Sequence, residues 1–175
     1  MLENLSHFLA DHASCERKAH AAALMLANKF PEHPELQDRM IGLAREELEH
    51  FHQVFRILKS RGIAVASDDI DQYVKRLMTF VRHPRSEHLL DRLLVAAMIE
   101  ARSCERFCLF AEAITESDLK SFYTDFAKAE SAHAPLFVQT AEIYYPKDLV
   151  RSRMDFWLDR EAEICSTSKL RAGVH

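Results

Sequence analysis

A glutamate three residues before a histidine occurs twice on the apolar side of a predicted helix, and this repeated pair restricts the fold strongly. Glu47 and His50 lie in REELEHFHQVF, and Glu130 and His133 lie in AESAHAPLF. Positions three, four and seven residues from each pair are mostly apolar, so both pairs face a core. Buried carboxylates and imidazoles are costly unless compensated, and a metal ion is the strongest compensator. The alternative is a buried network of acids and histidines.

Helical periodicity runs through most of the 175 residues, and only three glycines and five prolines interrupt it. This length suits one domain over residues 1–175 and is too short for two of ordinary size. The expected helices cover residues 3–28, 35–60, 69–82, 86–114, 117–145 and 147–166, the fifth with Ser117 as its N-cap. Two tight hairpins joined by a long crossover predict an all-α, ferritin-like four-helix bundle with an extra C-terminal helix.

Each predicted hairpin also carries a lone acid on the apolar stripe of its first helix. These acids are Glu16 and Glu100, and small residues such as alanine surround both. The complete candidate set of metal ligands is Glu16, Glu47, His50, Glu100, Glu130 and His133. One Glu from each of two helices, with an E-x-x-H from each of the others, is the ligand set of di-iron and di-manganese carboxylate proteins. Hard oxygen donors with one imidazole per metal favour iron or manganese over structural zinc.

Hairpin geometry selects Glu100 over Glu105, although the tetrapeptide SCER occurs twice and would align Glu105 with Glu16. Residues at one level of an antiparallel hairpin lie about equally far from its turn. Glu16 and Glu47 are 31 positions apart, and Glu100 and Glu130 are 30 apart, whereas Glu105 is only 25 from Glu130. Glu105 also lies about 7 Å further along the helix, rotated off the apolar stripe. We therefore expect Glu105 to form an ion pair or to contact a ligand residue without binding the metal itself.

Several neighbours of these ligands have more than one interpretation. His12 and His20 lie four residues either side of Glu16, where they would hydrogen-bond to the ligand or to the ends of the bundle. Cys104 and Cys108 follow Glu100 and suit a core that admits a metal pair. Three aromatic residues suit core packing or the wall of an oxygen-access pocket: Phe107, Phe126 and Phe137.

Composition limits the remaining classes of protein. The four cysteines form no C-x-x-C pair, which argues against a zinc knuckle, a rubredoxin-like iron centre and a thioredoxin motif. Free thiols favour a reducing, cytoplasmic location. No apolar run reaches the roughly 18 residues of a membrane span, and the N-terminus is unlike a signal peptide, so no membrane partner is expected. The net charge of −4 tells against a wholly basic nucleic-acid surface but permits a local patch.

The segments CERKAHA, EELEHF, IEARSCERF and AESAHAPLF, in this order and spacing, resemble the MiaE family of bacterial tRNA hydroxylases. The resemblance covers nearly the whole chain, and all six candidate ligands match. It implies a non-haem monooxygenase with two Fe ions, O₂ as co-substrate and an external electron-transfer partner. It also implies a tRNA substrate, the methylthiolated, isopentenylated adenosine beside the anticodon, which would be hydroxylated on its isopentenyl group.

Binding of tRNA requires positive charge at the contact surface. The candidates are Arg56, Lys59, Arg61, Arg82, Arg85, Arg151 and Arg153. For each residue taken alone, a solvated helix surface is the simpler explanation. Recognition of an unstacked base also needs an aromatic or guanidinium platform, and the sequence does not identify one.

Three other functions share parts of this pattern. An iron-storage or ferroxidase protein would use the same ligands, assemble into a cage and mineralise iron. A peroxide-scavenging relative of rubrerythrin would usually carry a C-x-x-C iron domain, which this sequence lacks. A helical binding module stabilised by metal would need no oxygen reactivity at all.

Overall fold

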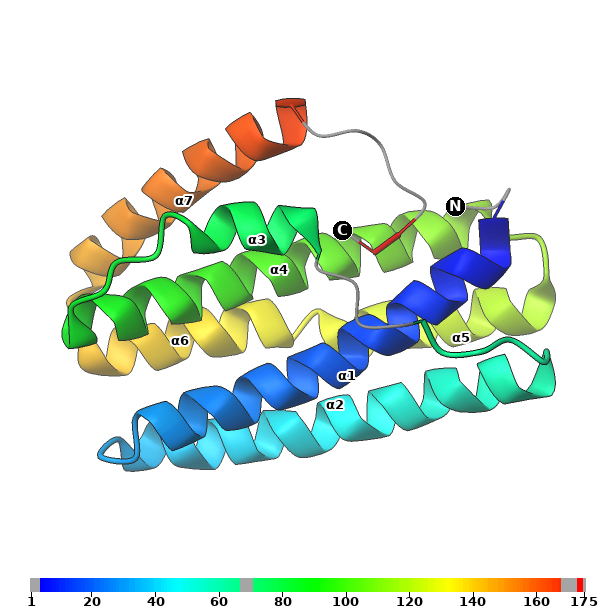
Figure 1. Cartoon of the computed structure of the whole chain (residues 1–175), viewed down its shortest axis with the longest axis horizontal. Coiled ribbons are helices and arrows are strands. Elements are labelled where there is room, and N and C mark those ends of the chain that lie inside the picture. Colours follow the sequence, from blue (N-terminus) through cyan, green and yellow to red (C-terminus); the bar gives the residue numbers. More distant parts are fainter. Residues whose placement is uncertain (1–3, 67–70, 168–172, 175) are drawn as a thin grey trace. The chain divides into compact units, whose positions relative to one another are not determined.

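The structure, a computed structural model, describes residues 4–66, 71–167 and 173–174. Its helices are α1 (Leu5–Lys29), α2 (Pro34–Ser60), α3 (Gln72–Met78), α4 (Arg85–Ala113), α5 (Ser117–Glu130), α6 (His133–Tyr144) and α7 (Lys147–Thr167) (Figure 1). No strand occurs in the described ranges, so the all-α prediction is confirmed. The chain divides into two compact units: α1 and α2 with residues 173–174, and α3 to α7.

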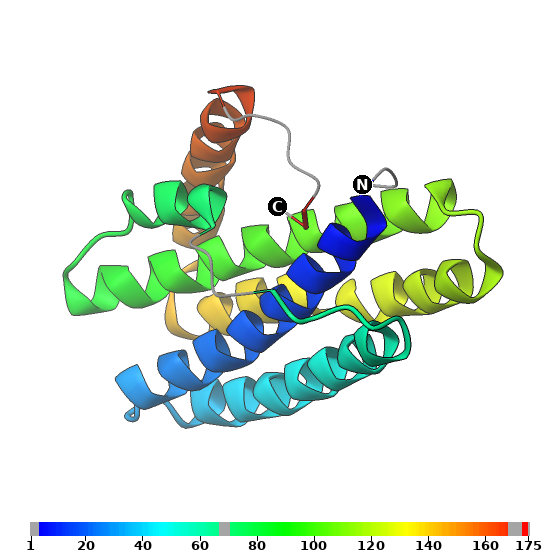
Figure 2. The same ribbon diagram turned by 45° about the vertical axis from the view of Figure 1, so that its right-hand side comes forward.

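The first unit is an antiparallel hairpin whose short connection is fixed by specific hydrogen bonds (Figures 1 and 2). Pro34 occupies the first turn of α2, where its missing N–H costs nothing. Nε2 of Gln37 donates to the carbonyl oxygens of Ala27 (2.6 Å) and Phe30 (3.1 Å), which lie at the end of α1. Carbonyl groups at the end of α1 therefore receive an additional partner from α2, and the two helices are held side by side.

The far end of α2 closes with a glycine in the left-handed region. Gly62 has φ of 65°, which a residue without Cβ adopts at little cost. Its neighbour Ile63 donates its backbone N–H to the carbonyl of Leu58 at 3.0 Å, and Gly62 itself donates to Lys59 at 3.3 Å. This pair of bonds is the Schellman motif, which ends α2 within one residue of the predicted position.

The second unit is organised around α4, the longest helix. Helices α5 and α6 return along α4, while α3 and α7 also pack on it. An aromatic cluster fills the space between α4 and α5, with the Phe110 and Tyr123 ring centroids 4.6 Å apart and the Phe107 and Phe126 centroids 5.2 Å apart. All four rings are buried, which gives this hairpin a dry interior.

The predicted single helix over residues 117–145 is wrong, because the chain breaks between α5 and α6 at residues 131–132 (Figure 1). Pro135 supplies the physical reason. It has no N–H to donate to the carbonyl of Ser131, and its ring clashes with that carbonyl. Ser131 and Ala132 keep right-handed helical dihedral angles, and regular bonding resumes with Leu136 donating to Ala132 at 3.1 Å. The break therefore interrupts the ladder of hydrogen bonds, although both residues keep helical dihedral angles.

Two other helix starts differ from prediction. The N-cap of α5 is Glu116, and the Ser117 hydroxyl instead bonds to Oδ1 of Asp118 at 3.2 Å, so the predicted Ser117 cap is wrong. Helix α3 is shorter than the predicted 69–82, of which residues 69–70 lie outside the described part. Oδ1 of Asp71 caps it by accepting from the backbone N–H of Tyr73 at 2.8 Å. A capping side chain thus fixes where α3 begins.

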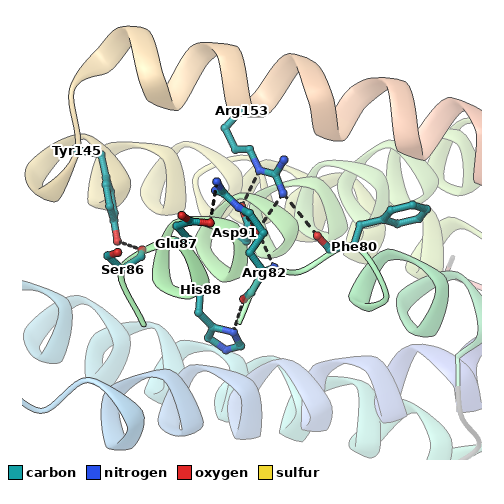
Figure 3. A network of polar contacts seen from close by, with 8 residues as sticks. All are labelled: Phe80, Arg82, Ser86, Glu87, His88, Asp91, Tyr145 and Arg153. Carbon is teal, nitrogen blue, oxygen red and sulfur yellow. Dashed lines mark hydrogen bonds and ion pairs between the residues drawn. The ribbon is translucent and has the colours of Figure 1, made fainter. Parts of the chain in front are cut away.

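A fully buried carboxylate fastens the connection before α4 and the start of α7 onto α4 (Figure 3). Oδ2 of Asp91 accepts from the backbone N–H and from Nε of Arg82, both at 2.9 Å, and Oδ1 accepts from Nη2 at 2.8 Å. Arg153 donates from Nε to Oδ1 at 2.7 Å and from Nη2 to Oδ2 at 2.9 Å. Two guanidinium groups are therefore committed to one buried carboxylate of the second unit.

Among the described residues, no helix combines the length and the apolarity that crossing a membrane would require.

Candidate metal centre

The first unit brings three of the candidate ligands together on the facing sides of α1 and α2. Nδ1 of His50 lies 3.5 Å from Oε2 of Glu47 and 3.8 Å from Oε2 of Glu16. Glu47 is completely buried, and Glu16 and His50 are only 4% and 5% exposed. The E-x-x-H spacing brings Glu47 and His50 together, and Glu16 joins them because it lies about as far from the hairpin turn as Glu47 does. Two carboxylates and one imidazole are thus within reach of each other.

A fourth buried polar residue, His12, supports this cluster from one turn earlier on α1. Its Nε2 lies 2.9 Å from Oε1 of Glu16. Burial, reinforced by the nearby His50, lowers the pKa of His12 to about 3, so the imidazole is neutral. His20 has a different role, because its Nδ1 lies 2.6 Å from the carbonyl oxygen of Ala44 and ties α1 to α2. Of the two histidines that flank Glu16, only His12 touches the carboxylate.

The second unit contains the other three candidates. Nδ1 of His133 lies 3.0 Å from Oε2 of Glu130, and both side chains are at most 2% exposed. Glu100 on α4 is also buried, at 8% exposed. Glu130 is the last residue of α5 and His133 the first of α6, so this E-x-x-H spans the break that Pro135 introduces.

Glu105 occupies a different environment from Glu100. Its side chain is 63% exposed, and Oε2 lies 3.9 Å from Nη1 of Arg102 on the same helix. An exposed pair of this kind contributes little to stability. The contrast in burial favours Glu100 as the acid of α4 that belongs with the interior cluster.

Cys104 lies one turn after Glu100 on α4. Burial, together with Cys108 and Glu130, raises the pKa of Cys104 to about 11. Its Sγ lies 3.4 Å from the carbonyl oxygen of Ala127. The side chain is therefore a neutral thiol that bridges α4 and α5, consistent with its prediction as a small core residue.

One polar cluster close to the candidate ligands along α4 was not predicted from the sequence. Oε1 of Glu161 on α7 accepts from Nε of Arg102 at 2.8 Å and from the Tyr73 hydroxyl at 2.7 Å. Burial and Glu161 raise the pKa of Tyr73 well above its ordinary value, so the hydroxyl stays protonated. The partners are 59 and 88 positions apart, and no short motif relates them. The cluster holds α3 and α7 against α4, two residues from Glu100.

The donor set of each unit suits the same kind of metal. Two carboxylates and one imidazole provide hard oxygen donors with a single nitrogen, which suits iron or manganese. A structural zinc site would need more sulfur or imidazole ligands. The buried position of the donors matches a site that excludes bulk water.

Helical hairpins that each carry a buried glutamate and an E-x-x-H pair define the class of ferritin-like carboxylate metalloproteins. The chain belongs to the tRNA-(MS[2]IO[6]A)-hydroxylase (MiaE) family, whose family model matches residues 1–175. This family consists of tRNA hydroxylases, which are enzymes of the oxidoreductase type.

Two curated relatives carry the name tRNA 2-(methylsulfanyl)-N(6)-isopentenyladenosine(37) hydroxylase. The protein from Pseudomonas putida is 40% identical over 78% of this chain, and the match spans 66% of that protein, just under two thirds of its length. The protein from Salmonella typhimurium is 29% identical, over 93% of this chain and 77% of its own length.

A solved structure from Synechococcus, described as Protein 43 with aldehyde deformylating oxygenase activity, has a TM-score of 0.93 to this chain. It is 34% identical, and the match covers 99% of this chain and 88% of that one. The predicted ferritin-like all-α fold and the predicted family are both confirmed by these comparisons.

Proposed function

We propose that this chain hydroxylates the isopentenyl group of the methylthiolated, isopentenylated adenosine next to the anticodon of tRNA. The observation that carries the proposal is the family match over residues 1–175, which includes both buried E-x-x-H pairs. Two relatives named for this substrate support the choice of tRNA. A cytoplasmic location follows from that substrate.

The six ligand candidates belong, in this proposal, to one pair of iron ions in a single domain over residues 1–175. The buried E-x-x-H pairs each contribute a carboxylate and an imidazole, and Glu16 and Glu100 contribute the remaining carboxylates. This is the donor set of di-iron carboxylate bundles. Manganese suits the same donors, so metal analysis has to identify the ion.

The bound iron pair would supply the oxygen activation and redox chemistry that an unactivated isopentenyl C–H bond requires. Hydroxylation with O₂ transfers one oxygen atom to carbon and reduces the other to water, which consumes two electrons and two protons from outside the substrate. An external electron donor is therefore part of the proposal. The oxygenase activity described for the structurally similar Synechococcus protein supports a role for O₂.

The chain's own residues would keep this chemistry dry and its ligands in place. The buried rings of Phe107, Tyr123 and Phe126 belong to the same two helices as Glu100 and Glu130, and they would exclude water from that side. A dry site strengthens electrostatic interactions and limits side reactions. His12 contacts Glu16 at 2.9 Å and restricts its orientation.

The direct experiment is mass spectrometry of tRNA nucleosides from cells with and without the gene. We expect loss of the hydroxylated nucleoside and accumulation of its unhydroxylated precursor in the deletion strain. Restoration by the wild-type gene, but not by a Glu47→Ala/Glu130→Ala variant, would tie the activity to the buried pairs. An unchanged nucleoside profile would contradict the proposal. Iron mineralisation by the purified protein would then support the ferroxidase alternative.

A further inference from the structure

The buried Asp91 cluster removes two arginines from the set that could bind RNA. Arg82 gives its Nε and Nη2 to Asp91, and its Nη1 lies 3.2 Å from Oε2 of Glu87. Arg153 gives its Nε and Nη2 to the same carboxylate (Figure 3). Its Cζ also lies over the ring of Phe156, 3.9 Å from the ring centroid. The charges within this cluster balance, so it presents no net positive field to phosphate.

The second half of α2 has the opposite character. Residues 50–67 contain Arg56, Lys59 and Arg61 and no Asp or Glu, in a chain whose net charge is −4. Basic residues near a helix C-terminus also interact favourably with the helix dipole, which accounts for part of this enrichment. The dipole does not explain the aromatic residue among them.

Four residues of α2 share one exposed face at spacings of three, four and seven: His52, Phe55, Arg56 and Lys59. We call these four residues the α2 basic face. Phe55 is 40% exposed, and its ring lies 6.1 Å from the ring of Phe51, centroid to centroid. His52, at the other end of the face, lies 3.9 Å from Oε2 of Glu49, so the cations of the face are Arg56 and Lys59. An exposed aromatic ring next to cations is the combination that single-stranded nucleic acid binds, through base stacking and phosphate contacts.

We propose that the α2 basic face docks the anticodon loop of the tRNA, with Arg56 and Lys59 contacting phosphates and Phe55 stacking on an unpaired base. This inference rests on the proposed function and specifies where its substrate binds. Charge complementarity selects RNA over an apolar protein partner. The face lies on the same helix as Glu47 and His50, with Phe55 about 7.5 Å of helix rise and about 140° of rotation beyond His50. One helix therefore fixes the docked loop relative to two of the proposed ligands.

The first test neutralises the two cations. Arg56→Gln/Lys59→Gln should lower the affinity for a fluorescein-labelled tRNA about tenfold or more at 100 mM salt, because each lost phosphate contact removes released counterions. The slope of log affinity against log salt should become shallower by about 2. The matched control is Lys120→Gln/Lys128→Gln on α5, where both side chains are exposed and acidic residues are interspersed. We expect the control to bind tRNA as the wild type does.

The second test removes the aromatic platform. Phe55→Ala should lower tRNA affinity about fivefold or more without changing the salt slope, because stacking is not an ionic contact. Ile143→Ala on α6, which removes an apolar side chain of similar exposure, is its control. Thermal unfolding and iron content of every variant are measured alongside, and wild-type values are expected.

The outcomes separate this inference from the proposed function. If the wild type hydroxylates tRNA while the α2 variants bind as tightly as the wild type, the docking face is wrong and the function stands. If the α5 control loses as much affinity as the α2 variant, binding is not localised to α2 and the inference is also overturned. If the wild type neither binds nor hydroxylates tRNA, the proposed function fails with it.

Discussion

Nε2 of His12 lies 2.9 Å from Oε1 of Glu16, and the imidazole is completely buried. The equivalent position on the other hairpin, four residues before Glu100, is Ala96. The position that corresponds to His12 on the other hairpin therefore carries no imidazole.

The first prediction follows from this asymmetry. His12→Ala should lower the affinity for the first equivalents of ferrous or cobaltous ion about 10- to 100-fold, the usual effect of removing a residue that orients a ligand. His12→Gln keeps a polar group near Glu16 and should recover part of the loss. The measurement is anaerobic metal titration, with apoprotein unfolding as the control for folding. Equal affinities of His12→Ala and the wild type would mean that the contact does not position Glu16.

The second prediction distinguishes the two acids of α4. Glu100→Ala should lose a large share of the bound iron, because it removes a buried carboxylate from the proposed donor set. Glu105→Ala removes an exposed partner of Arg102 and should keep wild-type iron content. Metal analysis of the purified variants checks both. The reverse result would show that the repeated SCER tetrapeptide marks the ligand.

The third prediction concerns the stability provided by Asp91. Asp91→Asn leaves two arginines without their buried carboxylate, and breaking a buried ion pair by removing one partner costs about 3–5 kcal/mol. The free energy of unfolding in urea should fall by that amount. Glu87→Gln changes a more exposed partner of Arg82 and should cost less than about 1 kcal/mol. Equal, small losses in the two variants would contradict a structural role for Asp91.

The fourth prediction concerns the pH dependence of the same cluster. Burial alone would raise the pKa of Asp91, but hydrogen bonds from Arg82 and Arg153 outweigh it and lower that pKa below its ordinary value. A lowered pKa gives stability that is present above the ordinary Asp pKa of about 3.9 and is lost as the pH falls through the folded-state pKa.

The stability difference between wild type and Asp91→Asn should therefore be constant from about pH 7 to pH 5 and shrink below about pH 4. Calorimetry of the two apoproteins across this range measures it, and working without metal separates this effect from acid-driven loss of ions. A difference that grows on acidification would mean that Asp91 is not the titrating group.

Helix periodicity and E-x-x-H spacing predicted much of this molecule because both are local properties. The inward faces of α1 and α2 follow from residues three, four and seven apart, and Glu16, Glu47 and His50 do lie together. The equal distance of ligand acids from a hairpin turn likewise predicted that Glu100 is buried and Glu105 is not. Each of these inferences needed only one helix or one tight turn.

The sequence did not reveal the long-range partners of two arginines, and one helix prediction was wrong because of a proline. Arg82 and Arg153 were candidates for phosphate binding because each is a cation in sequence, yet both donate to Asp91, 9 and 62 positions away. No periodicity connects residues on different elements in this way. The break between α5 and α6 had a visible cause in Pro135, but the strong apolar pattern on both sides obscured it.

That break gives the two E-x-x-H pairs different mechanical properties. Glu47 and His50 are carried by one uninterrupted helix, so a displacement of either residue moves the other with it. Glu130 ends one helix and His133 begins the next, with an incomplete ladder of hydrogen bonds between them. Small rotations of α5 and α6 can therefore alter the separation of that carboxylate and imidazole at low cost. In the proposed centre, the jointed pair, Glu130 and His133, would be the side that adjusts when the charge or coordination of a bound ion changes, while the pair on α2 would stay fixed.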